Sequence, residues 1–319
     1  MEYRVLGKTG LKVSEICLGT MQFKWTTDEA TSHSVLDAFA EAGGNFIDTA
    51  DIYSRWGEGL HGGEAETIIG EWMKRKGNRD RIVLATKVRG RMWEGADGEG
   101  LSRAHITRAV EDSLRRLQTE TLDLYQSHSS DDNTPIEETL RAYDDLIKQG
   151  KARFIGCSNY SGDQLADAVQ TSQRDDLAEY ATIQPHYSLV ERQEFEENVF
   201  PAVKVYGLAI IPYSPLGRGF LTGKYRRGQP LPQSKRAGGV EKLLNDKNFA
   251  LLDKLEARGK ARGKTPGQMA LGWLLGQEQV TSVIVGANTP AQLADSLGAA
   301  GLRLGEEEMD VLDKASTWK

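Results

Sequence analysis

Eight short apolar segments recur along the chain, and no other feature of the sequence limits the possible fold as strongly. Each segment is rich in Ile, Val, Leu or Phe and is too short and too continuous for a surface helix, so each predicts a buried strand. The eight predicted strands are EICLG (15–19), NFID (45–48), IVLATK (82–87), LDLYQS (122–127), RFIGCS (153–158), ATIQPH (181–186), LAIIPYS (208–214) and SVIVGA (282–287).

The segments between these strands have helical spacing. One of them carries apolar residues on a single helical face, at Ile106, Val110, Leu114 and Leu117. Another begins with Thr134 as a cap and Pro135 in the first turn, and it ends on Gly150. Eight strands that alternate with helices predict an α/β fold, a (β/α)8 TIM barrel. A doubly wound sheet is the alternative, but the glycines of 217–223 have the wrong spacing for a dinucleotide-binding fingerprint.

The two ends of the chain extend this pattern. Residues 3–14 contain two short β-like pieces around Gly7 and Gly10, which predict an N-terminal hairpin that closes the bottom of the barrel. Residues 289–301 and 305–316 predict extra C-terminal helices. Because we find no low-complexity segment and no linker, we expect one domain that spans residues 1–319.

Composition restricts the classes of partner. The chain of 319 residues is 39% hydrophobic and 27% charged, which suits a globular protein with a sizeable core. Its net charge of -6 without a basic cluster argues against a nucleic-acid partner. Cys17 and Cys157 lie in apolar runs and predict buried, reduced thiols. With neither a signal peptide nor a membrane-length apolar run, we expect a cytoplasmic protein; no pattern indicates its oligomeric state.

Polar side chains follow the predicted strands where those strands end. The carboxyl ends of barrel strands converge on one face, which is where barrel active sites form. Asp48, Lys87 and His128 follow strands two, three and four, so we expect them to be neighbours, and Tyr53 lies one short loop beyond Asp48. The full set of polar endings is Thr20, Asp48, Lys87, His128, Ser158, Asn159, Gln184, Tyr213, Ser214 and Gly286.

These four residues suit acid catalysis on a carbonyl oxygen. A lysine cation beside Tyr53 favours the phenolate and is expected to lower the tyrosine pKa by roughly 1–3 units. Asp48 is expected to hold Lys87, while His128 donates a hydrogen bond to the oxygen. Since none of the four is a nucleophile, the electrons must come from elsewhere, most naturally as hydride from a nicotinamide cofactor. Each residue alone is often structural, but four of them at successive strand ends favour a functional role.

Over nearly its whole length the sequence resembles the aldo-keto reductase superfamily, in the bacterial type related in pattern to potassium-channel β subunits. The matching motifs are FIDTADIY, LATKV, DLYQSH, IGCSNYS, IQPHYSLV, YSPLGRGFLTGKY and VIVGANTPAQLADSLGA. The resemblance implies a (β/α)8 barrel and metal-free, NAD(P)H-dependent reduction of a carbonyl compound. By position it makes Tyr53 the proton donor, Lys87 and Asp48 its tuning pair, and His128 the residue that orients the carbonyl.

The same resemblance implies where the cofactor binds. Ser158, Asn159 and Gln184 match the groups that hold the nicotinamide carboxamide, and Tyr213 is the ring that stacks on it, while Thr20, Met21 and Asp48 are further expected cofactor-binding residues. The pyrophosphate segment is Ser214, Pro215, Leu216, Gly217, Arg218 and Lys224, although this stretch can also be read as an ordinary basic loop. The adenosine segment is Gly286, Asn288, Gln292, Asp295 and Ser296.

The adenosine segment departs from the family pattern. Many relatives place Arg or Lys there to bind the 2′-phosphate of NADPH, whereas this chain has Asn288 and Gln292, with Lys224 or Arg236 as other sources of charge. We expect NADPH, with NADH as the alternative.

Three tryptophans predict a substrate pocket. Trp25, Trp56 and Trp93 fall in the loops after strands one, two and three, where they suit a ring-bearing or sugar-like carbonyl substrate. Each of them is equally suited to bracing its own loop. No role is assigned to the other histidines, of which the first three have solvated contexts: His33, His61, His105 and His186.

Other functions stay open. A cofactor-binding regulatory subunit is one, although His128 speaks against it. A metal-dependent hydrolase is another, but the first strand lacks a His-x-His pair and we expect no metal site. An NAD(P)-dependent sugar or alcohol dehydrogenase that runs oxidatively is the third.

Overall fold

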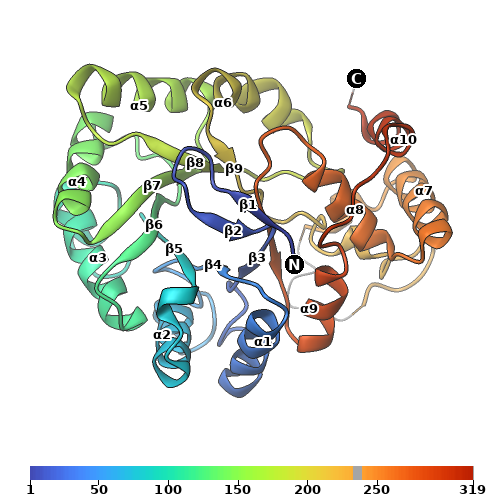
Figure 1. Ribbon diagram of the computed structural model, residues 1–319, viewed down its shortest axis with the longest axis horizontal. Coiled ribbons are helices and arrows are strands. Elements are labelled where there is room, and N and C mark those ends of the chain that lie inside the picture. Colours follow the sequence, from blue (N-terminus) through green and yellow to red (C-terminus); the bar gives the residue numbers. More distant parts are fainter. Residues whose placement is uncertain (233–238, 319) are drawn as a thin grey trace.

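The computed structural model describes residues 1–232 and 239–318 and shows an eight-stranded parallel sheet curled into a barrel, with helices around it (Figure 1). The order of the strands around the sheet is β10-β3-β4-β5-β6-β7-β8-β9. Backbone hydrogen bonds from Thr281 N to Ile210 O (2.9 Å) and from Ile284 N to Pro212 O (3.0 Å) join the two ends. The predicted (β/α)8 barrel is therefore confirmed. The strands are β3 (Ile16–Gly19), β4 (Phe46–Asp48), β5 (Val83–Val88), β6 (Leu122–Ser127), β7 (Ala152–Ser158), β8 (Tyr180–Gln184), β9 (Ala209–Ile210) and β10 (Val283–Gly286).

Helices connect the strands and surround the sheet (Figure 1). They are α1 (Glu29–Glu41), α2 (Glu64–Lys76), α3 (Arg103–Leu117), α4 (Ile136–Lys148), α5 (Gly162–Asp175), α6 (Phe200–Tyr206), α7 (Asp246–Arg262), α8 (Pro266–Leu275), α9 (Pro290–Leu297) and α10 (Glu306–Ser316). Short helical turns are η1 (Arg79–Arg81), η2 (Ala96–Gly98), η3 (Phe195–Val199), η4 (Phe220–Thr222) and η5 (Glu241–Leu243). The expected C-terminal helices are α9 and α10.

Side-chain caps explain where several helices begin. Ser102 accepts a hydrogen bond from His105 N at the start of α3, and Ser161 forms a capping box with Gln164 at the start of α5. The helix that was expected to begin with Thr134 as its cap has a different cap in the structure. Pro135 occupies the cap position of α4, and the Thr134 hydroxyl donates to Asp131 Oδ2 (2.8 Å) within the preceding loop.

The apolar core has two parts because successive residues of a strand point to opposite faces. The larger part lies between the sheet and the helices and includes the fully buried Trp72 and Trp273. The smaller part fills the barrel interior at the amino ends of the strands. It includes Phe46 and Leu124, which pack in one cluster with residues of the N-terminal hairpin.

The hairpin is formed by β1 (Tyr3–Val5) and β2 (Lys12–Ser14), which pair antiparallel. Leu6, Leu11 and Val13 are buried within the interior cluster, and Figure 1 shows the hairpin lying across the strands. The predicted closure of the barrel bottom is thus confirmed. Within the described ranges 1–232 and 239–318, we find no helix with the length and apolar character needed to span a membrane.

Candidate active site

A buried lysine connects the polar ends of neighbouring strands. Lys87 Nζ, on β5, donates to Asp48 Oδ2 on β4 (2.6 Å), to the backbone oxygen of Thr49 (2.9 Å) and to the hydroxyl of Tyr53 (3.0 Å). Lys87 is fully buried and Asp48 is 1% exposed. A charge is stable at such depth only with close partners, which these three oxygen atoms provide. The structure therefore brings together Asp48 and Lys87, which were predicted at adjacent strand ends, and Tyr53, which was predicted in the loop after Asp48.

Tyr53 reaches this cluster from the turn after β4. The next residue, Ser54, has a positive φ of 81°, a conformation that costs energy for a residue with a side chain. Its hydroxyl donates to Phe23 O (2.8 Å) and holds the turn in place. The ring of Tyr53 lies 5.8 Å from the ring of His128 and 6.0 Å from that of Trp56. Tyr53, His128 and Trp56 thus share one end of a cavity.

The ionisation of Tyr53 differs from the expectation. Burial raises the pKa of Tyr53 above its ordinary value, and the opposing effect of the Lys87 cation does not reverse this. The Lys87 cation acts in the expected direction, but the expected net lowering of the Tyr53 pKa was wrong. Burial alone lowers the pKa of Lys87. The neighbouring Asp48 and then Tyr53 raise it by a larger amount, so the net pKa lies above the ordinary value. The lysine is charged and the phenol is protonated at neutral pH.

His128 is neutral at neutral pH. Burial lowers its pKa to about 3, and the cations of Lys87 and Arg89 act in the same direction. A neutral imidazole still has one N–H group, so His128 can donate a single hydrogen bond to a ligand in the cavity.

Gln126 belongs to the same cluster but was missed from the sequence. Asp48 Oδ1 accepts hydrogen bonds from Gln184 Nε2 (2.9 Å) and Gln126 Nε2 (3.2 Å). Both glutamines are buried, and together with Lys87 they satisfy both oxygens of the Asp48 carboxylate. The available signal was the position of Gln126 two residues before His128, near the end of β6.

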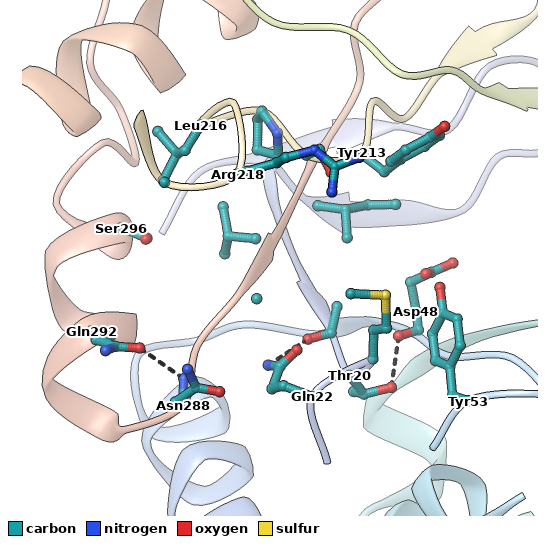
Figure 2. A pocket seen from close by; sticks show the side chains of 18 of the residues that line it. Thr20, Gln22, Asp48, Tyr53, Tyr213, Leu216, Arg218, Asn288, Gln292 and Ser296 are labelled. Carbon is teal, nitrogen blue, oxygen red and sulfur yellow. Dashed lines mark hydrogen bonds between the residues drawn. The ribbon is translucent and has the colours of Figure 1, made fainter. Parts of the chain in front are cut away.

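The four predicted residues lie at or beside an elongated cavity of about 730 Å³. Figure 2 shows Asp48 and Tyr53 at one end of it, Gln292 and Ser296 at the other, and Tyr213, Leu216 and Arg218 along one side. Gly217 lies within the segment that forms this side. The predicted cofactor residues that line the cavity are Thr20, Met21, Asp48, Ser158, Asn159, Gln184, Tyr213, Ser214, Pro215, Leu216, Arg218, Lys224, Gly286, Asn288, Gln292, Asp295 and Ser296.

A chain of hydrogen bonds orders the end of the cavity near His128. The Tyr213 hydroxyl donates to Asn159 Oδ1 (2.8 Å), and Asn159 Nδ2 donates to the backbone oxygen of His128 (2.9 Å). The Ser158 hydroxyl donates to Gln184 O (2.8 Å). These contacts hold the Tyr213 ring at the cavity wall.

Amide groups order the opposite end. Asn288 Oδ1 accepts hydrogen bonds from the hydroxyls of Thr26 (2.7 Å) and Thr27 (3.0 Å), and Gln292 Oε1 accepts one from Asn288 N (2.9 Å; Figure 2). Since both side-chain oxygens are engaged within the protein, the two NH₂ groups are the donors available to a ligand. Arg236, the other predicted source of charge, lies outside the described residues.

Gln22 was also missed from the sequence. It is 1% exposed, and its Nε2 donates to Gly19 O (3.0 Å) and to Ala287 O (2.9 Å). It thereby ties the end of β3 to the segment after β10, at the middle of the cavity (Figure 2). Its position just after the Gly-Thr-Met that ends strand one was the only sequence signal.

The three tryptophans have different surroundings. Trp56 lines the cavity. Trp25 packs edge-on against the Trp56 ring, with ring centroids 5.6 Å apart. Trp93 instead packs on the ring of His105 (4.7 Å) and the guanidinium of Arg108 (4.2 Å), both in α3. His105 is completely buried, so its expected solvated context was wrong.

The residues of the cavity fit a nicotinamide dinucleotide. The flat ring of Tyr213, on the side of the cavity near Tyr53, suits a nicotinamide (Figure 2). The cations of Arg218 and Lys224 suit a pyrophosphate. Amide and hydroxyl groups at the far end suit a ribose and its substituents. Along the cavity, Arg218 lies between Tyr213 and the end with Gln292 and Ser296, which is the order that a dinucleotide needs (Figure 2).

Comparison with known proteins agrees with this geometry. The sequence profile of the aldo/keto reductase family matches residues 15–317. An uncharacterized oxidoreductase of Bacillus subtilis (strain 168), YrpG, is 38% identical over 319 residues, which cover 98% of this chain and 95% of that protein. A probable voltage-gated potassium channel subunit beta of Oryza sativa subsp. japonica is 34% identical, with 94% and 91% of the two chains covered.

A third relative has a defined reaction in its name. L-glyceraldehyde 3-phosphate reductase of Escherichia coli O157:H7 is 32% identical, with 98% of this chain and 92% of that protein covered. The family match spans nearly the whole chain, as the sequence motifs had indicated. The chain therefore belongs to the aldo/keto reductase family and is an oxidoreductase.

Proposed function

We propose that the protein reduces an aldehyde or ketone to the alcohol with NADPH, and that Tyr53 is the general acid. The observation that carries this proposal is the position of Lys87 Nζ, which contacts Asp48 and Tyr53 together at one end of a dinucleotide-sized cavity. A cation so placed stabilises the phenolate that forms when Tyr53 gives up its proton.

A bound nicotinamide supplies the hydride in this reaction. Tyr53 is protonated at neutral pH, so it has a proton to donate as negative charge develops on the carbonyl oxygen. Asp48 keeps Lys87 charged and fixed, and two glutamines hold the second oxygen of Asp48. His128, a neutral donor that lines the same end, orients the carbonyl oxygen.

NADPH is proposed over NADH because the far end offers two amide donors, on Asn288 and Gln292, and both can bind phosphate oxygens. These groups are neutral, so the preference is expected to be modest. The proposed substrate is a small-molecule carbonyl compound, and the relative that reduces L-glyceraldehyde 3-phosphate makes short aldehydes the first to test. A reducing cytoplasm is proposed because Cys17 and Cys157 are buried free thiols.

Titration of the purified protein with NADPH and with NADH, followed by quenching of tryptophan fluorescence, is the first test. We expect both to bind, NADPH more tightly. A screen of aldehydes, ketones and the matching alcohols with the preferred cofactor then gives the substrate class and the direction of the reaction. Binding of neither cofactor would contradict the proposal, whereas binding without turnover of any carbonyl compound would favour a regulatory subunit.

A further inference from the structure

His186 lies directly against the ring of Tyr213. The centroids of the two rings are 5.1 Å apart and their planes differ by 9°, so the rings are stacked in parallel. The two residues also form a parallel β-bridge just beyond β8 and β9, and Tyr213 N donates to Pro185 O (3.0 Å). Side chain and backbone thus keep the imidazole and the phenol in register.

The two rings face different spaces. Tyr213 lines the elongated cavity, whereas His186 lines a neighbouring cleft of about 690 Å³. Asn159, which accepts the hydrogen bond of the Tyr213 hydroxyl, borders both spaces. The stacked pair is therefore part of the wall between the cavity and the cleft, with His186 on the cleft side.

The contacts of Tyr213 fix its ring from three directions. The Asn159 side chain holds the hydroxyl, the end of β8 holds the backbone, and His186 covers the face that points away from the cavity. Burial lowers the pKa of His186, with Glu191 acting against this and Arg218 in the same direction. The imidazole is thus neutral at neutral pH, and a neutral flat ring suits an offset parallel stack.

We propose that His186 is a positioning residue for the cofactor, which holds the Tyr213 ring so that its free face meets the nicotinamide. This inference rests on the proposed function and on the family resemblance, which implies that Tyr213 is the ring that stacks on the nicotinamide. Without a flat partner behind it, the phenol ring can tilt toward the cleft, and the surface offered to the nicotinamide is no longer planar. The adenosine half lies at the other end of the cavity and does not depend on this ring.

The test compares two ligands and three variants. His186→Leu keeps an apolar side chain but removes the flat face, His186→Phe keeps the flat face, and His61→Ala changes an exposed histidine as a control. Dissociation constants are measured for NADPH and for ADP-ribose 2′-phosphate, which lacks the nicotinamide. We expect His186→Leu to weaken the binding of NADPH about 2- to 10-fold, in line with the size of aromatic pair energies. The affinity for ADP-ribose 2′-phosphate should not change. His186→Phe should restore NADPH binding to within about twofold.

The outcomes separate this inference from the proposed function. If the wild-type protein binds both ligands and His186→Leu has the same two dissociation constants, the positioning role is wrong and the proposed function stands. Equal weakening of both ligands would also overturn the inference, since it would show a general loss of structure. If the wild-type protein binds neither ligand, the proposed function fails and this inference fails with it.

Discussion

The two ends of the barrel are made from the same strands, yet one is a closed apolar core, and at the other the strands end on polar residues beside an open cavity. On β4, Phe46 belongs to the interior core, and Asp48, two residues on, lies in the lysine cluster. On β5 and β6 the same step leads from Ala85 to Lys87 and from Leu124 to Gln126. Residues two apart on a strand share a face, so each of these three strands carries one apolar and one polar layer.

Backbone strain is more frequent at the open end. Among the described residues, six other than glycine have a positive φ in segments that follow the carboxyl ends of strands, namely Lys24, Ser54, Arg89, Asn159, Ser214 and Arg218, whereas three precede strands, namely Gln118, Asp176 and Gln279. Such conformations cost free energy and collect at functional sites. At the opposite end the hairpin closes the barrel with Leu6, Leu11 and Val13, all buried. One end therefore contributes stability, and the other is shaped for binding at some cost to it.

The largest expected effect is the loss of turnover on substitution of Tyr53, at the open end of the barrel. Tyr53→Phe removes the proposed acid but keeps the ring, so we expect turnover to fall by about 10²- to 10⁴-fold. Cofactor affinity should stay near that of the wild type, because Lys87 and Asp48 still pair. Steady-state rates and fluorescence titration measure the two effects. Near-normal turnover in this variant would remove Tyr53 from the mechanism.

The buried ion pair gives the next largest effect. Lys87→Met leaves the Asp48 carboxylate buried without a cation, and we expect the free energy of unfolding to fall by about 3–5 kcal/mol. Adding Asp48→Asn removes the unpaired charge and should recover much of this loss, because Gln126 and Gln184 remain. Urea denaturation of the two single variants and the double variant measures the coupling. A double variant no more stable than Lys87→Met would mean that the charge itself is not the cause.

A substitution at the closed end should separate stability from binding. Leu124→Ala leaves a cavity in the interior core, where Leu124 is fully buried, and we expect a loss of about 3 kcal/mol in the free energy of unfolding. Cofactor affinity and turnover of the folded protein should stay within about twofold of the wild type. A large loss of affinity would show that the two ends are coupled.

The smallest expected effect is the dependence of stability on pH at His128. Its pKa in the folded protein is about 3, below the ordinary value of 6.5, so the unfolded chain binds a proton first as the pH falls. His128 contributes nothing to this dependence well above pH 6.5, and between pH 6.5 and about 3 stability falls by about 1.4 kcal/mol per pH unit, which amounts to roughly 2 kcal/mol by pH 5.

His128→Gln should remove this part of the slope, while His61→Gln, which changes an exposed histidine, should not. Urea denaturation at neutral and at mildly acidic pH measures both. The other histidines whose pKa is lowered by burial, His105 and the half-buried His186, remain in both variants, so the difference isolates His128. An unchanged slope in His128→Gln would mean that His128 titrates normally in the folded protein.

Much of the site was predictable because strand periodicity places residues in layers. All eight strands and the contact of Asp48, Tyr53 and Lys87 follow from apolar runs that end on polar residues. Gln126 and Gln22 were missed because their role depends on which face of the chain points inward and on which carbonyl groups lie opposite. Trp93 shows the same limit, since its loop position suits the cavity but its ring packs on α3.

The barrel, its closed and open ends and the family could be recognised from the residues, because periodicity and motif order are properties of the chain alone. The ionisation of Tyr53 and the stacking of His186 on Tyr213 depend instead on the folded arrangement. A pKa depends on how burial and nearby charges balance at one point in space, and stacking depends on the relative orientation of two strands. Both are set by the packed protein, in which residues distant in sequence are brought to within a few ångströms.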